Sequence, residues 1–179
     1  GWGVSIAGAV YLYQVDGNTL TLLSTLLPED TREGDHFGRA LDLDSGQILV
    51  GAPQAYSLDS PGVAYLFSSS AGEWSQSERF TNDVPGDRFG ESVSLTVDRI
   101  LIGSPSEDNG DTLNVGYVSV FEPDLFGWGR TIKFTDNPNA EFRRFGAALD
   151  QVGNRVAVGA PGYTDWSEFN IREKGAVFL

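Results

Sequence analysis

The sequence predicts an all-β protein built from β-propeller blades, each a four-stranded antiparallel meander. The main observation is a block that occurs three times: a Phe-Gly pair followed by Gly-Ala-Pro or Gly-Ser-Pro, within residues 37–53, 89–105 and 145–161. In every copy the Phe and the Gly of the triplet lie 14 positions apart. No segment shows helical periodicity. A repeat of this kind indicates units that bury their faces only against their neighbours.

A second marker is a glycine that opens an apolar run. It recurs at Gly8, Gly62, Gly116 and Gly175, which lie 54, 54 and 59 residues apart. A period near 54 residues is long for a β-helix coil, and it suits a blade of four short strands that pack radially. The period therefore favours a propeller over a β-helix.

The second copy shows how each unit divides into strands. Residues 88–95 form the first strand, 97–98 turn the chain, 99–103 return, and 116–121 and about 128–135 supply the third and fourth strands. The continuous aliphatic run in the second strand is typical of a strand that is covered on both faces. Short connections between the four strands predict an antiparallel meander.

The order of strands predicts the organisation of the chain. We expect a partial blade with third and fourth strands at 1–35, complete blades at 36–87 and 88–143, and a partial blade with first to third strands at 144–179. The two ends each contribute a third strand, so they do not complete one blade between them. We expect that further blades of a longer chain, or other subunits, complete the ring, because open sheet edges are a liability.

The motif residues have an architectural interpretation. Glycine permits close approach of two backbones, and proline ends a strand because it cannot continue a central ladder. We assign this structural role to Phe37, Gly38, Gly51, Pro53, Phe89, Gly90, Gly103, Pro105, Phe145, Gly146, Gly159 and Pro161.

Composition narrows the range of partners. The 179 residues are 40% hydrophobic and carry a formal net charge of −13, which argues against nucleic acid and anionic membrane surfaces as partners. No apolar stretch approaches the roughly 18 residues of a membrane helix, so we expect no membrane insertion. Cysteine is absent, which excludes disulfides and thiolate metal sites. The chain opens on Gly1, so we expect a processed product or an excerpt.

The repeated block resembles the FG-GAP repeat, which builds the seven-bladed β-propeller of integrin α-subunits. The flanking segments 74–81 and 85–93 are more similar to FG-GAP arrays of bacterial and algal surface proteins. The similarity extends over nearly the whole chain and implies about three blades of a seven-bladed ring. It also implies extracellular or cell-surface recognition or adhesion, with no chemistry and no required cofactor.

The chain departs from integrin-type repeats at the first hairpin of each blade. Integrin repeats often carry a calcium loop there, whereas residues 42–46, 94–98 and 150–154 offer too few oxygen ligands for the 6–8 that calcium prefers. We expect tight turns of two to four residues instead. An acidic segment elsewhere, with Glu107, Asp108, Asn109 and Asp111, is a candidate calcium site, although Asp and Asn beside Gly are also common in turns.

Connection lengths indicate where recognition takes place. The variation lies in the second-to-third loops, 54–61, 106–115 and 162–174, and in the links between blades. In a meander these connections emerge on one face, and variable loops on a rigid scaffold often bind ligands. Candidate contact residues for a protein or glycan are the aromatics of these loops, which are either ligand anchors or packing groups: Tyr56, Tyr163, Trp166 and Phe169.

Catalytic motifs are lacking. The single histidine, His36, is replaced by Arg88 and Arg144 in the other copies, and there is no thiol for a nucleophilic dyad. A carboxylate pair for glycoside hydrolysis stays open, but no spacing selects one. We therefore predict a non-enzymatic binding module. The alternatives are a structural subunit of an extracellular filament or coat, and an accessory propeller domain of a larger enzyme.

Overall fold

The computed structural model describes residues 7–30, 33–54, 61–162 and 176–178. Within these residues the chain forms β-strands and no helix. The strands make four antiparallel sheets in which neighbours along the chain are neighbours in the sheet. This confirms the predicted fold class of antiparallel propeller blades. The described residues therefore include no helix with the length and apolar character needed to cross a membrane.

The first two sheets contain six strands. The first sheet pairs β1 (Val10–Asp16) with β2 (Thr19–Leu26). The second is a complete meander of β3 (Ala40–Asp44), β4 (Gln47–Ala52), β5 (Val63–Ser70) and β6 (Glu73–Thr81).

The third and fourth sheets repeat this pattern. The third is the meander β7 (Ser92–Thr96), β8 (Arg99–Ser104), β9 (Tyr117–Asp124) and β10 (Gly127–Phe134). The fourth contains β11 (Ala148–Val152), β12 (Arg155–Ala160) and β13 (Ala176–Phe178). The predicted segments 36–87 and 88–143 thus each hold one four-stranded sheet, and the blade number of a complete ring stays a prediction.

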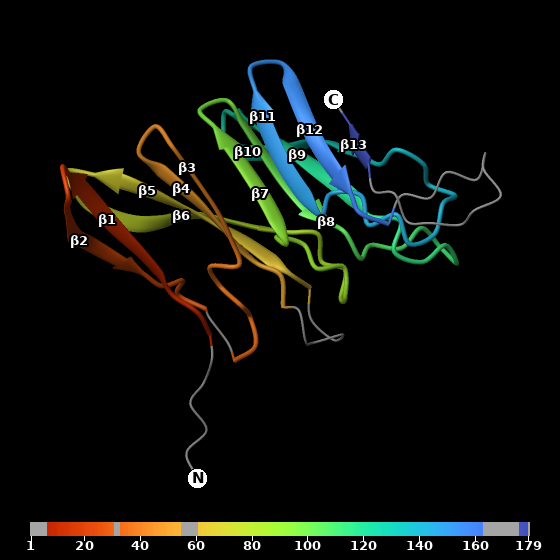
Figure 1. Ribbon diagram of the computed structural model, residues 1–179, viewed down its shortest axis with the longest axis horizontal. Helices are drawn as coiled ribbons and strands as arrows, with labels where there is room; N and C mark the ends of the chain where they lie inside the picture. Colours follow the sequence, from red (N-terminus) through yellow and green to blue (C-terminus); the bar gives the residue numbers. More distant parts are fainter. Residues whose placement is uncertain (1–6, 31–32, 55–60, 163–175, 179) are drawn as a thin grey trace, which may run out of the picture.

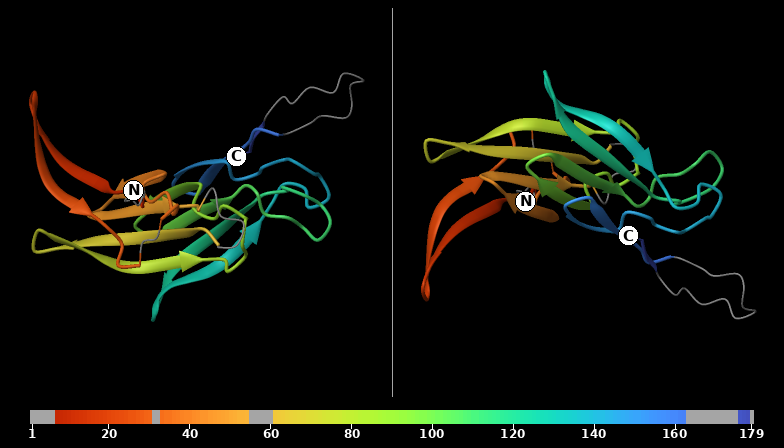
Figure 2. Two further views of the ribbon diagram at one scale, coloured as in Figure 1. Left: turned by 90° about the horizontal axis from the view of Figure 1, so that it is seen from below. Right: turned by 90° about the horizontal axis from the view of Figure 1, so that it is seen from above.

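Consecutive sheets are stacked next to one another and diverge toward their outer strands. They lie side by side in chain order (Figure 1), and the first strands β3, β7 and β11 of consecutive sheets contact one another. The outer hairpins β1–β2, β5–β6 and β9–β10 spread apart (Figure 2). Close inner strands and divergent outer strands give each unit the wedge shape of a propeller blade.

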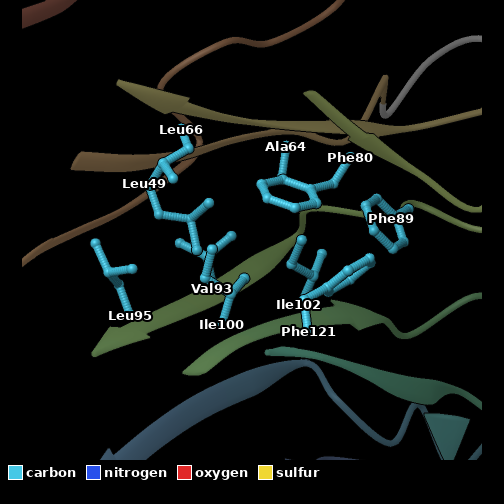
Figure 3. Close-up of a cluster of buried hydrophobic side chains, with 10 residues drawn as sticks. All are labelled: Leu49, Ala64, Leu66, Phe80, Phe89, Val93, Leu95, Ile100, Ile102 and Phe121. Carbon is cyan, nitrogen blue, oxygen red and sulfur yellow. The ribbon is translucent and has the colours of Figure 1, made fainter. Parts of the chain in front are cut away.

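The hydrophobic core lies between the sheets, because each central strand has apolar residues on both faces. Three clusters fill the three spaces between consecutive sheets, and each contains one motif Phe: Phe37, Phe89 or Phe145. Figure 3 shows the cluster between the second and third sheets, where Phe89 lies beside Phe121 with ring centroids 6.5 Å apart. The Phe of each motif therefore packs between its own sheet and the preceding one.

The motif glycines lie where backbones of consecutive sheets meet. Gly90 donates its N–H to the Gly103 carbonyl in its own sheet, at 3.0 Å. The Gly90 carbonyl also faces Gly51 of the preceding sheet so closely that a Cβ on Gly51 would lie 1.9 Å from it. Gly103 and Gly146 repeat this approach at the next junction. No side chain fits between such backbones, which explains why the two glycine positions recur together.

The residue before each Phe-Gly pair has a strained backbone. His36, Arg88 and Arg144 have φ angles of 56°, 59° and 54°, in the left-handed region that non-glycine residues seldom adopt. The N–H two residues after the Phe donates back to the carbonyl of this residue in all three copies. The same tight turn thus enters each sheet, whatever side chain occupies the position.

Candidate functional site: the loop-bearing rim

The two ends of the sheets differ in character (Figure 1). At one end, only two residues separate the strands of each hairpin, at 17–18, 45–46, 71–72, 97–98, 125–126 and 153–154. The predicted tight turns in the first hairpin of each blade are confirmed. The other end carries every longer connection of the described sheets, and we call it the loop-bearing rim. It is formed by the second-to-third loops and by the links between sheets.

The rim of the second sheet contains a polar cavity of about 90 Å³. This volume accommodates a few water molecules or one polar substituent of a ligand, and it is too small to enclose a ligand whole. The lining combines two carboxylates, a guanidinium, an amide and a hydroxyl with a short apolar wall: Asp30, Asp35, Gln54, Pro61, Val63, Tyr65 and Arg79.

Hydrogen bonds hold these side chains in place. The Tyr65 hydroxyl donates to Asp30 Oδ1 at 2.8 Å, and Arg79 Nε donates to Asp30 Oδ2 at 3.0 Å. Gln54 Nε2 donates to Asp35 Oδ1 at 2.7 Å. Burial of the Tyr65 ring, reinforced by the Asp30 carboxylate, raises the pKa of the Tyr65 hydroxyl. Tyr65 therefore stays a neutral donor to Asp30 at physiological pH.

The third sheet has a polar cluster at the same place in the repeat. Lys133, which takes the position of Arg79, pairs with the buried Glu107 carboxylate and lies 4.8 Å above the Tyr117 ring. Asn82 donates to Asp87 Oδ2 at 2.8 Å, and Asp87 is also buried. Here a lysine ammonium and a glutamate come together where the second sheet has its cavity.

Burial controls the electrostatics of this cluster. Desolvation, followed by the nearby Glu107 carboxylate, raises the pKa of Asp87 to about 7. Burial also raises the pKa of Glu107, against the opposing effect of Lys133. The cluster thus contains two carboxyl groups that resist ionisation and one cation that compensates them.

Between the third and fourth sheets the signs of the charges are reversed. Arg143 occupies the position of Asp35 and Asp87, two residues before the motif Phe, and is buried like them. Its Nη1 lies 3.3 Å from Asp136 Oδ2, where Asp136 takes the place of Asn82. A buried polar residue with a partner from the link therefore occurs both between the second and third sheets and between the third and fourth. The first pair is Asp87 with Asn82, and the second is Arg143 with Asp136.

The predicted calcium ligands do not converge on one point. Glu107 pairs with Lys133, Asp108 Oδ1 accepts the backbone N–H of Asn114 at 2.7 Å, and Asn109 Nδ2 donates to the Pro138 carbonyl at 2.9 Å. Asp111 is exposed. Within the described part of the chain, no group of three or more His, Asp or Glu side chains could hold a metal ion. This geometry does not support a calcium site in the segment, and calcium binding there stays a prediction.

The predicted aromatic contacts lie outside the described residues. Tyr56 belongs to 55–60, and Tyr163, Trp166 and Phe169 belong to 163–175. Their role in ligand contact stays a prediction. The described ends of the first of these loops, Gln54 and Pro61, line the cavity.

Sequence reasoning missed the cavity and the buried cluster. Asp35 and Asp87 lie just before the Phe-Gly pairs, where Asp is typical of turn caps, yet both are buried and accept hydrogen bonds from amide side chains. A signal was present: these two Asp residues share a repeat position, and Arg79 and Lys133 lie 54 residues apart. Charged residues that recur at a fixed place in a repeat, next to an apolar strand, indicate a shared polar site.

The fold and the rim define the class of protein as a β-propeller repeat scaffold with its longer connections at one end. The sequence model of a family described as FG-GAP repeat matches residues 21–67 and 74–121, which together make up more than half of the chain. The chain belongs to the FG-GAP repeat family. Each matched segment begins in the last strand of one sheet and ends in the third strand of the next. A comparison with curated proteins finds no match.

FG-GAP repeats are commonly extracellular adhesion or binding modules. Their proteins are typically extracellular or associated with the cell surface.

Proposed function

We propose that this chain is a non-catalytic recognition module of an extracellular or cell-surface protein, and that it binds a protein or glycan through the loop-bearing rim. The observation that supports the proposal is the asymmetry between the two rims. In the described sheets the six hairpin turns at one end have the same length, whereas the connections at the other end differ in length between repeats and carry the polar cavity. Functional residues concentrate on variable loops that a rigid scaffold positions.

The cavity gives the rim a specific contact chemistry. Arg79 and Gln54 offer N–H donors, Asp30 and Asp35 offer carboxylate acceptors, and Pro61 with Val63 forms an apolar wall. A ligand group with both hydroxyl donors and acceptors, or a polar peptide side chain, matches this lining. The small volume means that the ligand extends across the neighbouring loops and inserts one substituent.

A binding screen tests the proposal. The fluorescently labelled chain is applied to arrays of glycans and of extracellular proteins, and hits are compared with an Arg79→Ala/Gln54→Ala variant. The matched control is Asn18→Ala on the opposite rim. We expect the cavity variant to lose at least several-fold in affinity and the control to match wild type. An absence of hits, or equal loss in both variants, contradicts rim-mediated recognition.

A second function, as a structural subunit of a surface assembly, is favoured by a different observation. Within the described residues, large apolar side chains on β1, β2 and β3 are exposed. Isolated exposed apolar residues are ordinary, but a set on one sheet face marks an interaction surface.

A further inference from the structure

The link before each motif Phe has a left-handed backbone at a second position. The residue three places before the Phe is Gly34, Gly86 or Phe142, and the φ angles are 87°, 84° and 57°. Glycine adopts this region without steric cost, whereas a Cβ crowds the backbone there. Two copies therefore have the residue that this conformation favours, and the third has a phenylalanine instead.

Backbone contacts on both sides hold Phe142 in this conformation. Its N–H donates to the Leu113 carbonyl at 2.8 Å. Its own carbonyl faces Gly162 so closely that a Cβ on Gly162 would lie 1.7 Å from it. A strained backbone persists only where the surrounding structure determines it, and such positions are common at functional sites. The fold, and not the side chain, thus sets the φ of Phe142.

Burial of the ring does not account for the phenylalanine. Phe142 is 51% exposed, whereas the motif residue Phe145, three positions later, is 1% exposed. The equivalent Gly34 points into open space, since a Cβ there would meet no atom within 4 Å. Gly34 lies in the link between the first and second sheets, where sheets are present on both sides. Exposure is therefore a property of this position in the repeat.

A second apolar residue lies next to Phe142 on the loop-bearing rim. Leu113 belongs to loop 106–115 and is 44% exposed, and its carbonyl accepts the Phe142 N–H. The Arg144 N–H donates to the Asn114 carbonyl at 3.0 Å, so the link and the loop run side by side. Backbone hydrogen bonds thus hold Phe142 and Leu113 together as an exposed apolar pair.

The charged groups around this pair are mostly acidic. Loop 106–115 and link 135–147 carry three exposed carboxylates and one exposed cation: Asp108, Asp111, Glu141 and Arg144. Aromatic side chains on a rigid scaffold are typical anchors of protein interfaces, and complementary charges around an anchor select the partner. An apolar side chain that is flanked by Lys or Arg matches this surface.

We propose that Phe142 and Leu113 form an anchor site for a protein ligand, which packs an aliphatic or aromatic side chain flanked by Lys or Arg against the pair. The ring of Phe142 contributes to binding instead of folding, and this contribution offsets the strain of its backbone. The inference rests on the recognition function proposed above and names a protein as the ligand. It adds a contact that is separate from the polar cavity of the second sheet.

The stabilities of Phe142→Gly and Phe142→Ala test the strain without a ligand. At a negative φ the alanine variant is the more stable, whereas at a positive φ the order is reversed. We expect Phe142→Gly to melt about 2–4 °C above Phe142→Ala when circular dichroism follows unfolding. A Phe142→Ala protein that is at least as stable as Phe142→Gly overturns the proposal.

The same two substitutions at Phe126 provide the matched control. Phe126 is 97% exposed on the opposite rim, and its φ is outside the left-handed region. We expect Phe126→Gly to melt no higher than Phe126→Ala. A gain for glycine at both positions would be a general effect of the substitution, and it overturns the assignment of strain to Phe142.

A phage library of random linear peptides tests the ligand class. The library is selected on the immobilised wild-type chain, and the recovered clones are then measured on Phe142→Gly and Phe126→Gly. We expect the clones to contain an aromatic or aliphatic residue beside Lys or Arg. We also expect them to lose at least several-fold in affinity for Phe142→Gly and to bind Phe126→Gly as they bind wild type.

The outcomes separate this inference from the function on which it rests. Protein, peptide or glycan hits that bind Phe142→Gly as tightly as wild type retain recognition by the rim and overturn the anchor site. Glycan hits that depend on Phe142, without protein or peptide hits, overturn the protein ligand. A wild-type chain that binds nothing on the arrays or in the library overturns both proposals.

Discussion

The backbone N–H of Leu95 donates to the Asp42 carboxylate at 2.7 Å, and this bond joins the first strands of two consecutive sheets. The strands themselves do not pair, because β3 and β7 belong to different sheets. Asp42 bridges them by accepting one N–H from its own strand and one from the next sheet. A side chain thus supplies one polar connection across a junction whose core is apolar, beside the ion pair of Arg39 with Glu91.

Asp42→Ala tests this bridge. A hydrogen bond to a charged acceptor contributes about 1.5–3 kcal/mol, so we expect a loss of roughly 2 kcal/mol in the free energy of unfolding. The measurement is urea denaturation followed by tryptophan fluorescence. The control is Asp44→Ala, since Asp44 is two residues away and its Oδ1 accepts a hydrogen bond from the exposed Ser45 hydroxyl. Equal losses in both variants contradict a bridging role for Asp42.

Gly51→Ala tests the backbone contact between sheets. A Cβ on Gly51 would lie 1.9 Å from the Gly90 carbonyl, and backbone cannot move aside cheaply. We expect a loss of more than about 3 kcal/mol in stability or a failure to fold.

The matched control for this prediction is Gly46→Ala. Gly46 has a φ of 76° but open space around its Cα, so the substitution costs only about 1–2 kcal/mol of backbone strain. Thermal unfolding by circular dichroism measures both variants. A Gly51→Ala protein as stable as Gly46→Ala refutes the close contact.

The sequence predicted the sheets because each strand has an intrinsic signal. Continuous apolar runs such as Ile100-Leu101-Ile102 identify central strands, and glycine with proline ends them. The fixed spacing of Phe89 and Gly103 transfers the pattern from one copy to the next. Strand order, the two-residue turns and the class of fold followed from these local signals.

The polar groups of the loop-bearing rim could not be predicted from the sequence, because their arrangement depends on contacts between repeats. The cavity at Tyr65 requires Asp30 from a link and Arg79 from a fourth strand. A bulge between the third and fourth strands, at Leu66/Phe67 and again at Arg130/Ile132, also has no marker in the sequence. Such features arise from packing, which a single sequence does not display.

The raised pKa of Asp87 predicts that the stability of the folded protein falls as pH rises. Its pKa is about 7 in the folded protein and 3.8 as an ordinary value. Below about pH 4 both states bind the proton and there is no penalty. Between about pH 4 and pH 7 the unfolded state releases the proton first, so the folded state loses stability, by about 2–4 kcal/mol. Above about pH 7 the loss is constant.

Asp87→Asn removes this titration while it preserves the size of the side chain. We expect the variant to be more stable than wild type near pH 8, and the difference to shrink as pH falls toward about 5. Urea denaturation across this range measures it. Parallel pH profiles for the two proteins would falsify the assignment.

Lys133 compensates the buried Glu107 charge. Lys133→Met keeps the aliphatic stem and removes the ammonium, which leaves Glu107 buried among polar groups without its cation. Because Lys133 is partly exposed, we expect a loss of about 1–3 kcal/mol, which is less than for a fully buried pair. Adding Glu107→Gln should restore part of it. A double-mutant cycle measures the coupling, and additive effects of the two substitutions contradict the pair.

The pair of Glu107 with Lys133 also affects whether the acidic segment can bind calcium. An ion at the acidic segment would need Glu107, which already faces the Lys133 ammonium, and Asp108, one oxygen of which accepts a backbone N–H. A ligand that binds only the folded state stabilises it by mass action, about 2.7 kcal/mol at a hundred times its Kd. We therefore expect millimolar calcium and EDTA to give the same melting temperature. A melting temperature that rises with calcium would contradict this expectation. A calcium site in the segment would be established if Asp108→Asn and Asp111→Asn abolish the rise and an Asp98→Asn control on the opposite rim retains it.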